Sequence, residues 1–220
     1  MLVEGRLDRR AQEVVDLARS HGVPVYREKN RVLDQVASGG HHQGVAAEIS
    51  GISWWSLEDL LASAPAPALL VALDEVEDPR NFGAVVRAAD GAGAHGIVVP
   101  KRKAAPPSDV AIAASAGAVL HALLARVTNL SDSLEKAKKS NIWTVGLSPS
   151  AKVPWFDFDF TSPIMIVLGA EGHGLRPRVA KTCDQLVYLP QLGQVDSLKV
   201  SVAAGIVLYE TLRQRLQRGR

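Results

Sequence analysis

The fold of this chain is decided by residues 69–87, which read LLVALDEVEDPRNFGAVVR. The apolar run Leu69–Leu73 predicts a buried strand, and the small residues of Gly83–Gly91 predict a helix. The polar loop between them follows the carboxyl end of a strand, where α/β folds place their chemistry. Asn81 and Arg87 offer one amide and one guanidinium to a ligand above this edge of the sheet. We expect Asn81 to lie close to the helix cap, where its side chain would satisfy a free backbone N–H.

Strand and helix patterns alternate along the rest of the chain. Continuous apolar runs predict strands over Gly96–Val99, Leu123–Val127, Ile142–Leu147, Ile164–Leu168 and Leu186–Leu189. Between them, helices are predicted over Asp109–Leu120, Leu134–Ser140, Arg176–Thr182 and Leu198–Leu216. Apolar strands separated by helices predict an α/β fold, in which a parallel sheet is covered by helices on both faces.

Shorter elements precede this region. Helices are predicted over Leu7–Ser20 and Arg31–Ala37, and strands over Val23–Tyr26 and Gly44–Ile49. Ser56 is the expected cap of a further helix, and the alternating alanines and prolines of 64–68 are typical of a linker. We therefore predict a small α/β N-terminal domain over 1–50, a linker over 51–68 and a main domain over 69–220.

Composition limits the cellular setting of the protein. The chain has 220 residues, of which 47% are hydrophobic, and its formal charge of +2 is weak evidence for any partner. Basic residues form four clusters, at 6–10, 101–103, 136–139 and 213–220. Such clusters form either phosphate-binding patches or solvated helix faces, and the sequence alone leaves both interpretations open.

The single cysteine, Cys183, excludes an internal disulfide and fits a reducing compartment. No apolar run reaches the roughly 18 residues of a membrane span. The N-terminus is charged from Glu4 onward, which is not typical of a secretory leader. The sequence therefore predicts a cytoplasmic protein without a membrane segment.

A second loop of interest, GAEGHG at residues 169–174, joins the strand Ile164–Leu168 to a helix. Its spacing is neither the dinucleotide fingerprint nor a P-loop, so a dehydrogenase is disfavoured. The glycines allow the backbone to approach a ligand closely, although a tight strand-to-helix turn explains them equally. Glu171 either binds a ligand's donor groups or orients an arginine, or it is a simple exposed carboxylate.

The last helix is preceded by Ser197, which is the expected helix cap. The helix opens with small residues, which allow another segment to pass close by. Its apolar side is sufficient for core or dimer packing, and consists of Val202, Ile206, Tyr209 and Leu216.

Together these segments resemble the SPOUT superfamily of knotted methyltransferases, in particular the branch of RNA ribose 2′-O-methyltransferases that includes TrmH and RlmB. The resemblance covers residues 69–217. Its three motifs match at Asn81–Arg87 with the preceding Asp78-Pro79, at Leu168–Gly172, and from Ser197-Leu198 to Tyr209-Glu210. Residues 21–49, which include Gly39 to His42, resemble the end of the RNA-binding domain that precedes the catalytic domain in RlmB-like enzymes.

The resemblance implies a C-terminal deep trefoil knot that binds S-adenosylmethionine, largely through backbone groups. By match, this cofactor is bound by Gly169, Gly172, Leu189 and Leu198. The resemblance also implies a homodimer whose interface contains the knot and the last helix. No metal is predicted, since adjacent residues such as His41 and His42 cannot easily face one ion.

Four residues match the family's catalytic positions. Arg87 corresponds to the catalytic arginine, and we expect it to anchor a phosphate because a guanidinium is normally protonated. Asn81 and Glu171 would orient Arg87, and Ser197 would contact Arg87 or the substrate. The implied reaction is methyl transfer to a ribose 2′-hydroxyl, on a guanosine of 23S ribosomal RNA.

Two departures from the family pattern leave alternatives open. The N-terminal domain begins partway through the family's domain, so we expect a truncated domain that binds RNA less well. Lys199 stands where the third motif has an asparagine, and an ammonium donates hydrogen bonds but cannot accept them. These departures motivate one alternative, a catalytically impaired RNA-binding member of the family. The other alternative is a transfer-RNA ribose methyltransferase, which the N-terminal domain disfavours because such enzymes usually lack it.

Overall fold

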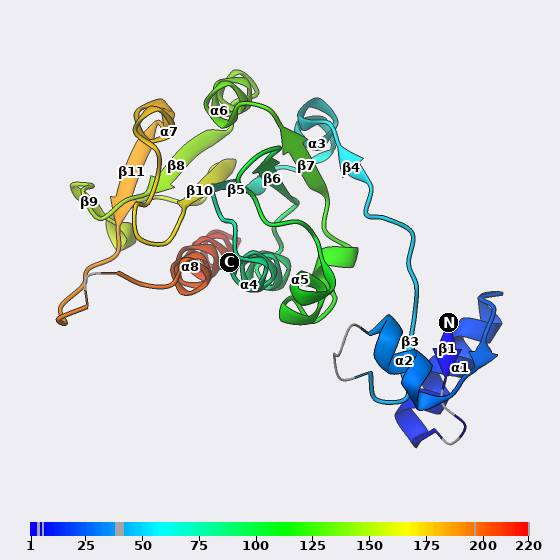
Figure 1. Ribbon diagram of the computed structural model, residues 1–220. Coiled ribbons are helices and arrows are strands. Elements are labelled where there is room, and N and C mark those ends of the chain that lie inside the picture. The colour runs from blue at the N-terminus through cyan, green and yellow to red at the C-terminus, as the bar shows by residue number, and fades with distance from the viewer. Residues whose placement is uncertain (4, 6, 38–41, 196, 220) are drawn as a thin grey trace. The chain divides into compact units, whose positions relative to one another are not determined.

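The computed structural model describes residues 1–3, 5, 7–37, 42–195 and 197–219. Of the residues singled out above, Glu4, Arg6, Gly39 to His41 and Arg220 lie outside this described part. The chain divides into two compact units, Met1–Gly51 and Ile52–Arg220. Figure 1 shows the elements of both, and each unit is described by itself below.

The first unit is a small α/β arrangement around a three-stranded sheet. The strands follow the order β2-β1-β3, with β1 parallel to β2 and antiparallel to β3. Its elements are β1 (Leu2–Val3), α1 (Arg9–Ser20), β2 (Tyr26–Arg27), α2 (Asn30–Val36) and β3 (Val45–Ala46). Val3, Val15 and Leu33 are buried and form its core. Asp8 caps α1 by accepting a hydrogen bond from the backbone N–H of Ala11 at 2.7 Å.

The second unit is built on an eight-stranded sheet with the order β4-β7-β6-β5-β10-β8-β11-β9. Every neighbouring pair of strands is parallel. The strands are β4 (Trp54–Trp55), β5 (Leu69–Asp74), β6 (Gly96–Pro100), β7 (Leu124–Val127), β8 (Trp143–Leu147), β9 (Val153–Pro154), β10 (Ile164–Gly169) and β11 (Gln185–Tyr188). The predicted parallel sheet is thus confirmed.

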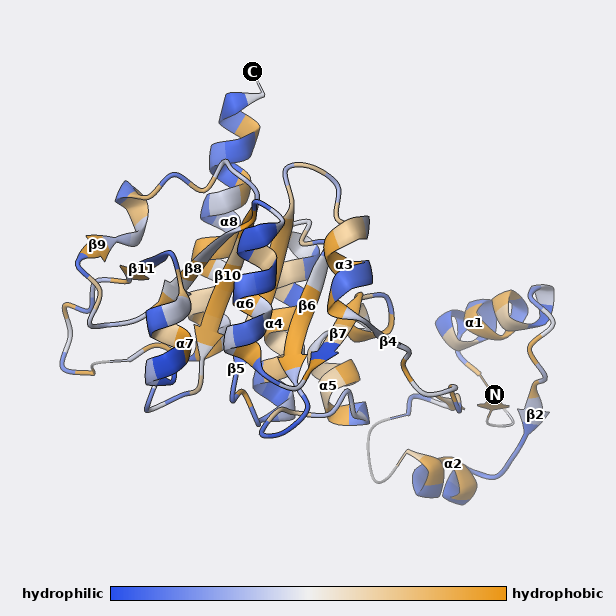
Figure 2. Cartoon of the chain, turned by 90° about the horizontal axis from the view of Figure 1, so that it is seen from above, coloured by the Kyte–Doolittle hydropathy of each residue, from blue (hydrophilic) through white to orange (hydrophobic). Residues whose placement is uncertain are grey.

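Helices cover both faces of this sheet, as predicted (Figure 1). They are α3 (Leu57–Ser63), α4 (Pro79–Gly91), α5 (Asp109–Ala114), α6 (Leu130–Lys139), α7 (Pro177–Thr182) and α8 (Val200–Arg218), with 3-10 turns η1 (Ala118–Leu120) and η2 (Trp155–Asp157). One face packs alternate strand residues against α4, α5 and α8, and the other packs the intervening residues against α3, α6 and α7. Figure 2 shows the central strands as hydrophobic, which fits burial on both faces.

The boundary between the two units follows Gly51, at the start of the predicted linker 51–68 rather than at its end. Most of the expected linker 51–68 belongs to the second unit, because β4 pairs with β7 and Leu57 and Leu60 of α3 are buried in its core. Ser56 caps α3 as predicted, by accepting a hydrogen bond from the backbone N–H of Asp59 at 3.0 Å.

Three predicted helix starts were wrong, of which the first is that of α6, which begins at Leu130 rather than Leu134. α4 is capped by Asp78, whose carboxylate accepts hydrogen bonds from the backbone N–H groups of Arg80 and Asn81. Asn81 therefore lies inside the helix, after Pro79 at its first position. α8 begins at Val200, so Lys199 occupies the cap position without a side-chain cap bond, and Ser197 lies outside the helix.

The predicted helix Asp109–Leu120 is broken in the structure. Ala116 and Gly117 adopt left-handed conformations, with φ of 52° and 90°, which end α5 before η1 begins. Within the described part of the chain, none of the helices is both long and apolar enough to span a membrane.

Candidate functional site

A pocket of about 150 Å³ lies at the carboxyl edge of the sheet, beyond the ends of β8, β10 and β11. The carboxyl ends of parallel strands are the usual ligand site of α/β sheets. The pocket is lined by residues 147–149 after β8, 168–172 and Gly174 after β10, Leu189 and Gln191 after β11, and Ser197, Leu198, Val200 and Ala203 at the start of α8.

The walls of the pocket are apolar on most sides. Leu147, Leu168, Leu189, Leu198 and Val200 come from four separate segments of the chain and surround the same space. The turn after β10 adds backbone N–H and C=O groups, and Glu171 adds one carboxylate. Such a pocket can hold a flat apolar group between leucines while the backbone reads the polar edge of that group.

The glycine turn has a shape that side chains at two positions would disturb. Ala170 and Gly174 exchange backbone hydrogen bonds of 3.2 and 3.0 Å, which close the turn on itself. A Cβ atom on Gly169 would lie 2.2 Å from the backbone carbon of Gly174. Gly172 has a φ of 92°, which side chains rarely adopt. The glycines are therefore needed for the tight turn itself, and this turn lines one side of the pocket.

A buried ion pair fixes the end of this turn to the neighbouring strand. The carboxylate of Asp74, at the end of β5, is fully buried and lies 2.6 Å from the Arg176 guanidinium. Arg176 is the residue before α7, directly after the turn. The hydrogen bond to Asp74 and the nearby negative charge raise the pKa of Arg176 above its usual value, despite its partial burial.

Glu75 adds three contacts to this ion pair, with two cations and one histidine. Its carboxylate lies 3.1 Å from Lys103 Nζ, 3.3 Å from His173 Nε2 and 3.6 Å from an Arg176 guanidinium nitrogen. Burial opposes ionisation of Glu75, but the hydrogen bond from Lys103 and the surrounding positive charges outweigh it and lower the pKa of this carboxyl. The glycine turn is therefore tied to the end of β5 through the side chains of both His173 and Arg176.

Six of the eight predicted site residues line the one pocket, namely Gly169, Glu171, Gly172, Leu189, Ser197 and Leu198. Asn81 and Arg87 do not. Arg87 is exposed on α4, and within the described part of the chain no hydrogen bond or ion pair joins it to Asn81, Glu171 or Ser197. The predicted orientation of Arg87 by Asn81 and Glu171 is thus not seen in the single chain.

The sequence analysis missed several residues of the site. Leu147 to Pro149 line the pocket because β8 lies beside β10 in the sheet, and this adjacency has no signal in the sequence order. Asp74 and Arg176 are 102 residues apart and carry no shared motif. Among the described residues, no group of three acidic, histidine or cysteine side chains is arranged to hold a metal ion.

Two family models match the chain. The SpoU rRNA Methylase family matches residues 68–209, and a model described as RNA 2'-O ribose methyltransferase substrate binding matches residues 1–55. The two matches follow the same order as the two compact units of the structure.

Known relatives extend over nearly all of the chain. The 23S rRNA (guanosine-2'-O-)-methyltransferase RlmB of Pseudomonas syringae pv. tomato is 42% identical over 217 residues, which are 97% of this chain and 86% of the relative. The crystal structure of the SpoU methyltransferase AviRb from Streptomyces viridochromogenes in complex with the cofactor AdoMet has a TM-score of 0.81 at 27% identity, covering 98% of this chain and 82% of that one.

A third relative, the AdoMet-bound rRNA methyltransferase from Sinorhizobium meliloti, has a TM-score of 0.74 at 26% identity and covers 96% of this chain and 79% of its own. The resemblance found in the sequence motifs is confirmed. With a family model matching most of its length and a relative 42% identical over nearly all of it, this chain belongs to the SpoU rRNA methylase family.

Proposed function

We propose that this protein is an enzyme that transfers the methyl group of S-adenosylmethionine to a ribose 2′-hydroxyl of RNA, on a guanosine of 23S ribosomal RNA. The observation that carries the proposal is the pocket at the carboxyl edge, where the second motif, Leu168–Gly172, and the start of the third, Ser197-Leu198, meet. The name of the RlmB relative describes this reaction, and two solved relatives contain AdoMet.

The residues of the pocket fit this cofactor. Leu147, Leu189 and Leu198 provide apolar walls for an adenine ring, and the backbone of the glycine turn provides donors and acceptors for its edge and for the ribose. Gly169 and Gly172 line the pocket without a side chain, so they leave the backbone groups of the turn uncovered. When bound, the cofactor supplies a methyl group already activated by its sulfonium charge.

The chain's own residues then have to orient the acceptor ribose and bind its phosphate. We assign the phosphate to Arg87, whose guanidinium is exposed and without an ion pair in the described part of the chain. Asn81, Glu171 and Ser197 are assigned to the ribose and to the orientation of Arg87. The 2′-oxygen would take the methyl group as the bond between that methyl and the sulfonium sulfur breaks, which would leave a neutral thioether, and the hydroxyl proton would pass to water.

We also propose the deep trefoil knot of the family. The strand order supports it, because β10 lies between β5 and β8 while β11 lies on the far side of β8. After β11 the chain returns to pack α8 against α4 (Figure 1). The pocket is then formed by the segments that such a knot brings together.

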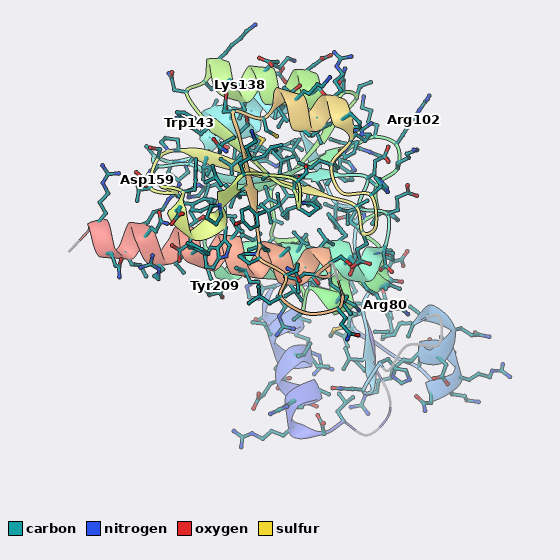
Figure 3. All side chains as sticks on the ribbon, turned by 90° about the vertical axis from the view of Figure 1, so that its left-hand side faces the viewer. Arg80, Arg102, Lys138, Trp143, Asp159 and Tyr209 are labelled. Carbon is teal, nitrogen blue, oxygen red and sulfur yellow. The ribbon has the colours of Figure 1, made fainter. Side chains whose placement is uncertain are left out.

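A homodimer is proposed from the outer face of α8. The inner face packs on the core through Val200, Ala204 and Leu208. The outer face carries Val202 and Tyr209, which are 47% and 51% exposed, and Figure 3 shows Tyr209 on this helix. An apolar stripe of this kind on a surface helix is typical of an interface. Arg87 lies on the neighbouring helix α4, so a second copy bound to the outer face of α8 would also supply neighbours for Arg87.

The first unit is assigned to RNA binding, since the substrate-binding model matches residues 1–55. A ribosomal RNA substrate places the enzyme in the cytoplasm. The free Cys183 is consistent with this reducing compartment, and burial raises the pKa of its thiol to about 12, so it is unreactive.

The test is a product analysis with methyl-labelled S-adenosylmethionine. The protein is incubated separately with 23S ribosomal RNA and with total transfer RNA, and each RNA is digested to nucleosides for mass spectrometry. We expect labelled 2′-O-methylguanosine from the ribosomal RNA. Label on a base, or label confined to transfer RNA, would overturn the assignment.

A second candidate, an RNA-binding member without catalysis, is favoured by Lys199. This residue is exposed at the cap of α8 and does not line the pocket, although its neighbours Ser197 and Leu198 do. Calorimetric titration with S-adenosylmethionine separates the candidates. A folded protein that does not bind the cofactor would favour the inactive scaffold.

A further inference from the structure

A second pocket lies at the same edge of the sheet, on the other side of the glycine turn. It has a volume of about 600 Å³ and is lined by residues that follow β5, β6 and β7 and by the starts of α6 and α7. Gly174 lines the cofactor pocket, whereas Arg176, two residues later, lines the second pocket. One turn of the chain therefore separates the two.

The lining of the second pocket carries more positive than negative charge, also when Asp74 and Asp132, the partners of Arg176 and Arg178, are counted. It contains the four cationic side chains of Arg102, Lys103, Arg176 and Arg178, against the single carboxylate of Glu75. Arg176 and Lys103 are held by Asp74 and Glu75, so they form the fixed inner wall. The net charge of the lining favours an anionic ligand.

The two remaining cations are available to a ligand. Arg102 is exposed and makes no hydrogen bond or ion pair within the described residues, and Figure 3 shows its side chain extending away from the unit. Arg178 has one partner, Asp132, at 3.3 Å, and both side chains are well exposed. Exposed pairs of this kind are worth little, so a phosphate can replace Asp132 readily.

The start of α6 adds uncharged donors to the same pocket. Asn129, Leu130 and Ser131 line it, and they are the cap and the first two residues of a ten-residue helix. Asn129 caps the backbone N–H of Asp132. A helix N-terminus carries a partial positive charge that adds to that of the arginines.

We infer that this second pocket, the phosphate groove, binds the sugar-phosphate backbone of the RNA next to the nucleotide being methylated. The inference rests on the proposed function and adds a site to it. The volume is larger than one phosphate needs, and the cations come from two separate segments, after β6 and at the start of α7, so they can contact successive phosphates. An RNA strand whose reacting ribose lies at the cofactor pocket has only the Gly169–Arg176 turn to cross before it reaches the phosphate groove.

The test uses two double variants of the full chain that remove the same charge. The groove variant, Arg102→Gln with Arg178→Gln, removes the two cationic side chains of the phosphate groove that are available to a ligand. Lys139→Gln with Lys181→Gln is the matched control, because these exposed lysines lie in the last turns of α6 and α7 and do not line the groove. Thermal unfolding and S-adenosylmethionine titration check that both variants fold and keep the cofactor pocket.

The measurement is the affinity for a fluorescently labelled single-stranded RNA of mixed sequence over a range of salt concentrations. For the groove variant we expect affinity to fall roughly tenfold. The slope of log affinity against log salt should become shallower by about 0.7 for each phosphate that the variant no longer binds. The control should differ from wild type by less than about twofold, since exposed charges outside the groove are screened.

Equal affinities and slopes for the groove variant and the control would overturn the inference. Methylation of 23S ribosomal RNA by the wild-type protein is measured in the same series. Its absence would refute the proposed function, while a loss of affinity confined to the groove variant would still support the groove.

Discussion

The buried carboxylate of Asp74 accepts hydrogen bonds from both the backbone N–H and the Nε of Arg176, at 2.8 and 2.7 Å. This interaction joins the end of β5 to the residue that follows the glycine turn. The cofactor pocket lies on one side of it and the phosphate groove on the other. The Asp74–Arg176 ion pair therefore lies between the two sites.

Removal of this carboxylate is expected to destabilise the protein. Asp74→Ala removes the acceptor of two hydrogen bonds from Arg176, whose side chain is 41% exposed, so we expect the free energy of unfolding to fall by roughly 2 kcal/mol. Urea unfolding measures this change, and cofactor affinity should fall with it because the turn is released. Glu58→Ala, which breaks the exposed ion pair with Lys136, is the control and should change stability by less than about 1 kcal/mol. Equal destabilisation of both variants would contradict this account.

A methyl group on the glycine turn should block the cofactor pocket. In Gly169→Ala the new Cβ would meet the backbone of Gly174 and Leu175, which cannot move without opening the turn. We expect S-adenosylmethionine to bind at least roughly tenfold more weakly, measured by calorimetry. Gly51→Ala adds the same methyl group where nothing lies within 4 Å, and its affinity should match wild type.

Stability should depend on pH through Glu75. Because its folded pKa is below the unfolded value, its contribution is present above the unfolded value of about 4.3 and is lost as pH falls through the folded value. Glu75→Gln should therefore be less stable than wild type near pH 7, and the difference should shrink near pH 3. Urea unfolding of both proteins at the two pH values checks this. A difference that is constant with pH would show that the ion pairs do not contribute.

A charge on the outer face of α8 should separate the proposed dimer. Val202→Asp would bury an unpaired carboxylate in an apolar interface, which raises the dimer dissociation constant at least roughly tenfold. Sedimentation equilibrium measures it. Val110→Asp is the matched control, because Val110 on α5 is 43% exposed and Val202 is 47% exposed. A wild-type monomer, or equal behaviour of the two variants, would refute this interface.

The parallel sheet, and the alternation of strands and helices along the chain, were predictable from the sequence. Continuous apolar runs such as Leu69–Leu73 are typical of strands that are buried on both faces. Helix starts were less predictable, since two polar residues near one start both suit a cap. Asp78 was the better candidate than Asn81, because Pro79 after it favours the first position of a helix. At α8, Ser197 is the residue type that favours a helix cap, but it lines the pocket instead, and Lys199 occupies the cap position.

The candidate site was predictable only where a motif supplied its residues. The glycine turn and the segment before α8 were found from the motifs, and the structure places both at one pocket. Contacts between distant segments were not predictable, since Asp74 and Arg176 meet only because β5 and β10 are neighbours. The short strand β4 was missed because two residues carry too little periodicity to distinguish an edge strand from a linker.

Arg87→Ala tests the central claim most directly. Transfer of label from S-adenosylmethionine to 23S ribosomal RNA is compared with cofactor affinity, for this variant and for Arg80→Ala, an exposed arginine seven positions earlier on the same helix. We expect Arg87→Ala to lose roughly a hundredfold or more in methyl transfer with unchanged cofactor affinity, and Arg80→Ala to retain the wild-type rate. Full methyl transfer by the Arg87→Ala enzyme would contradict the account.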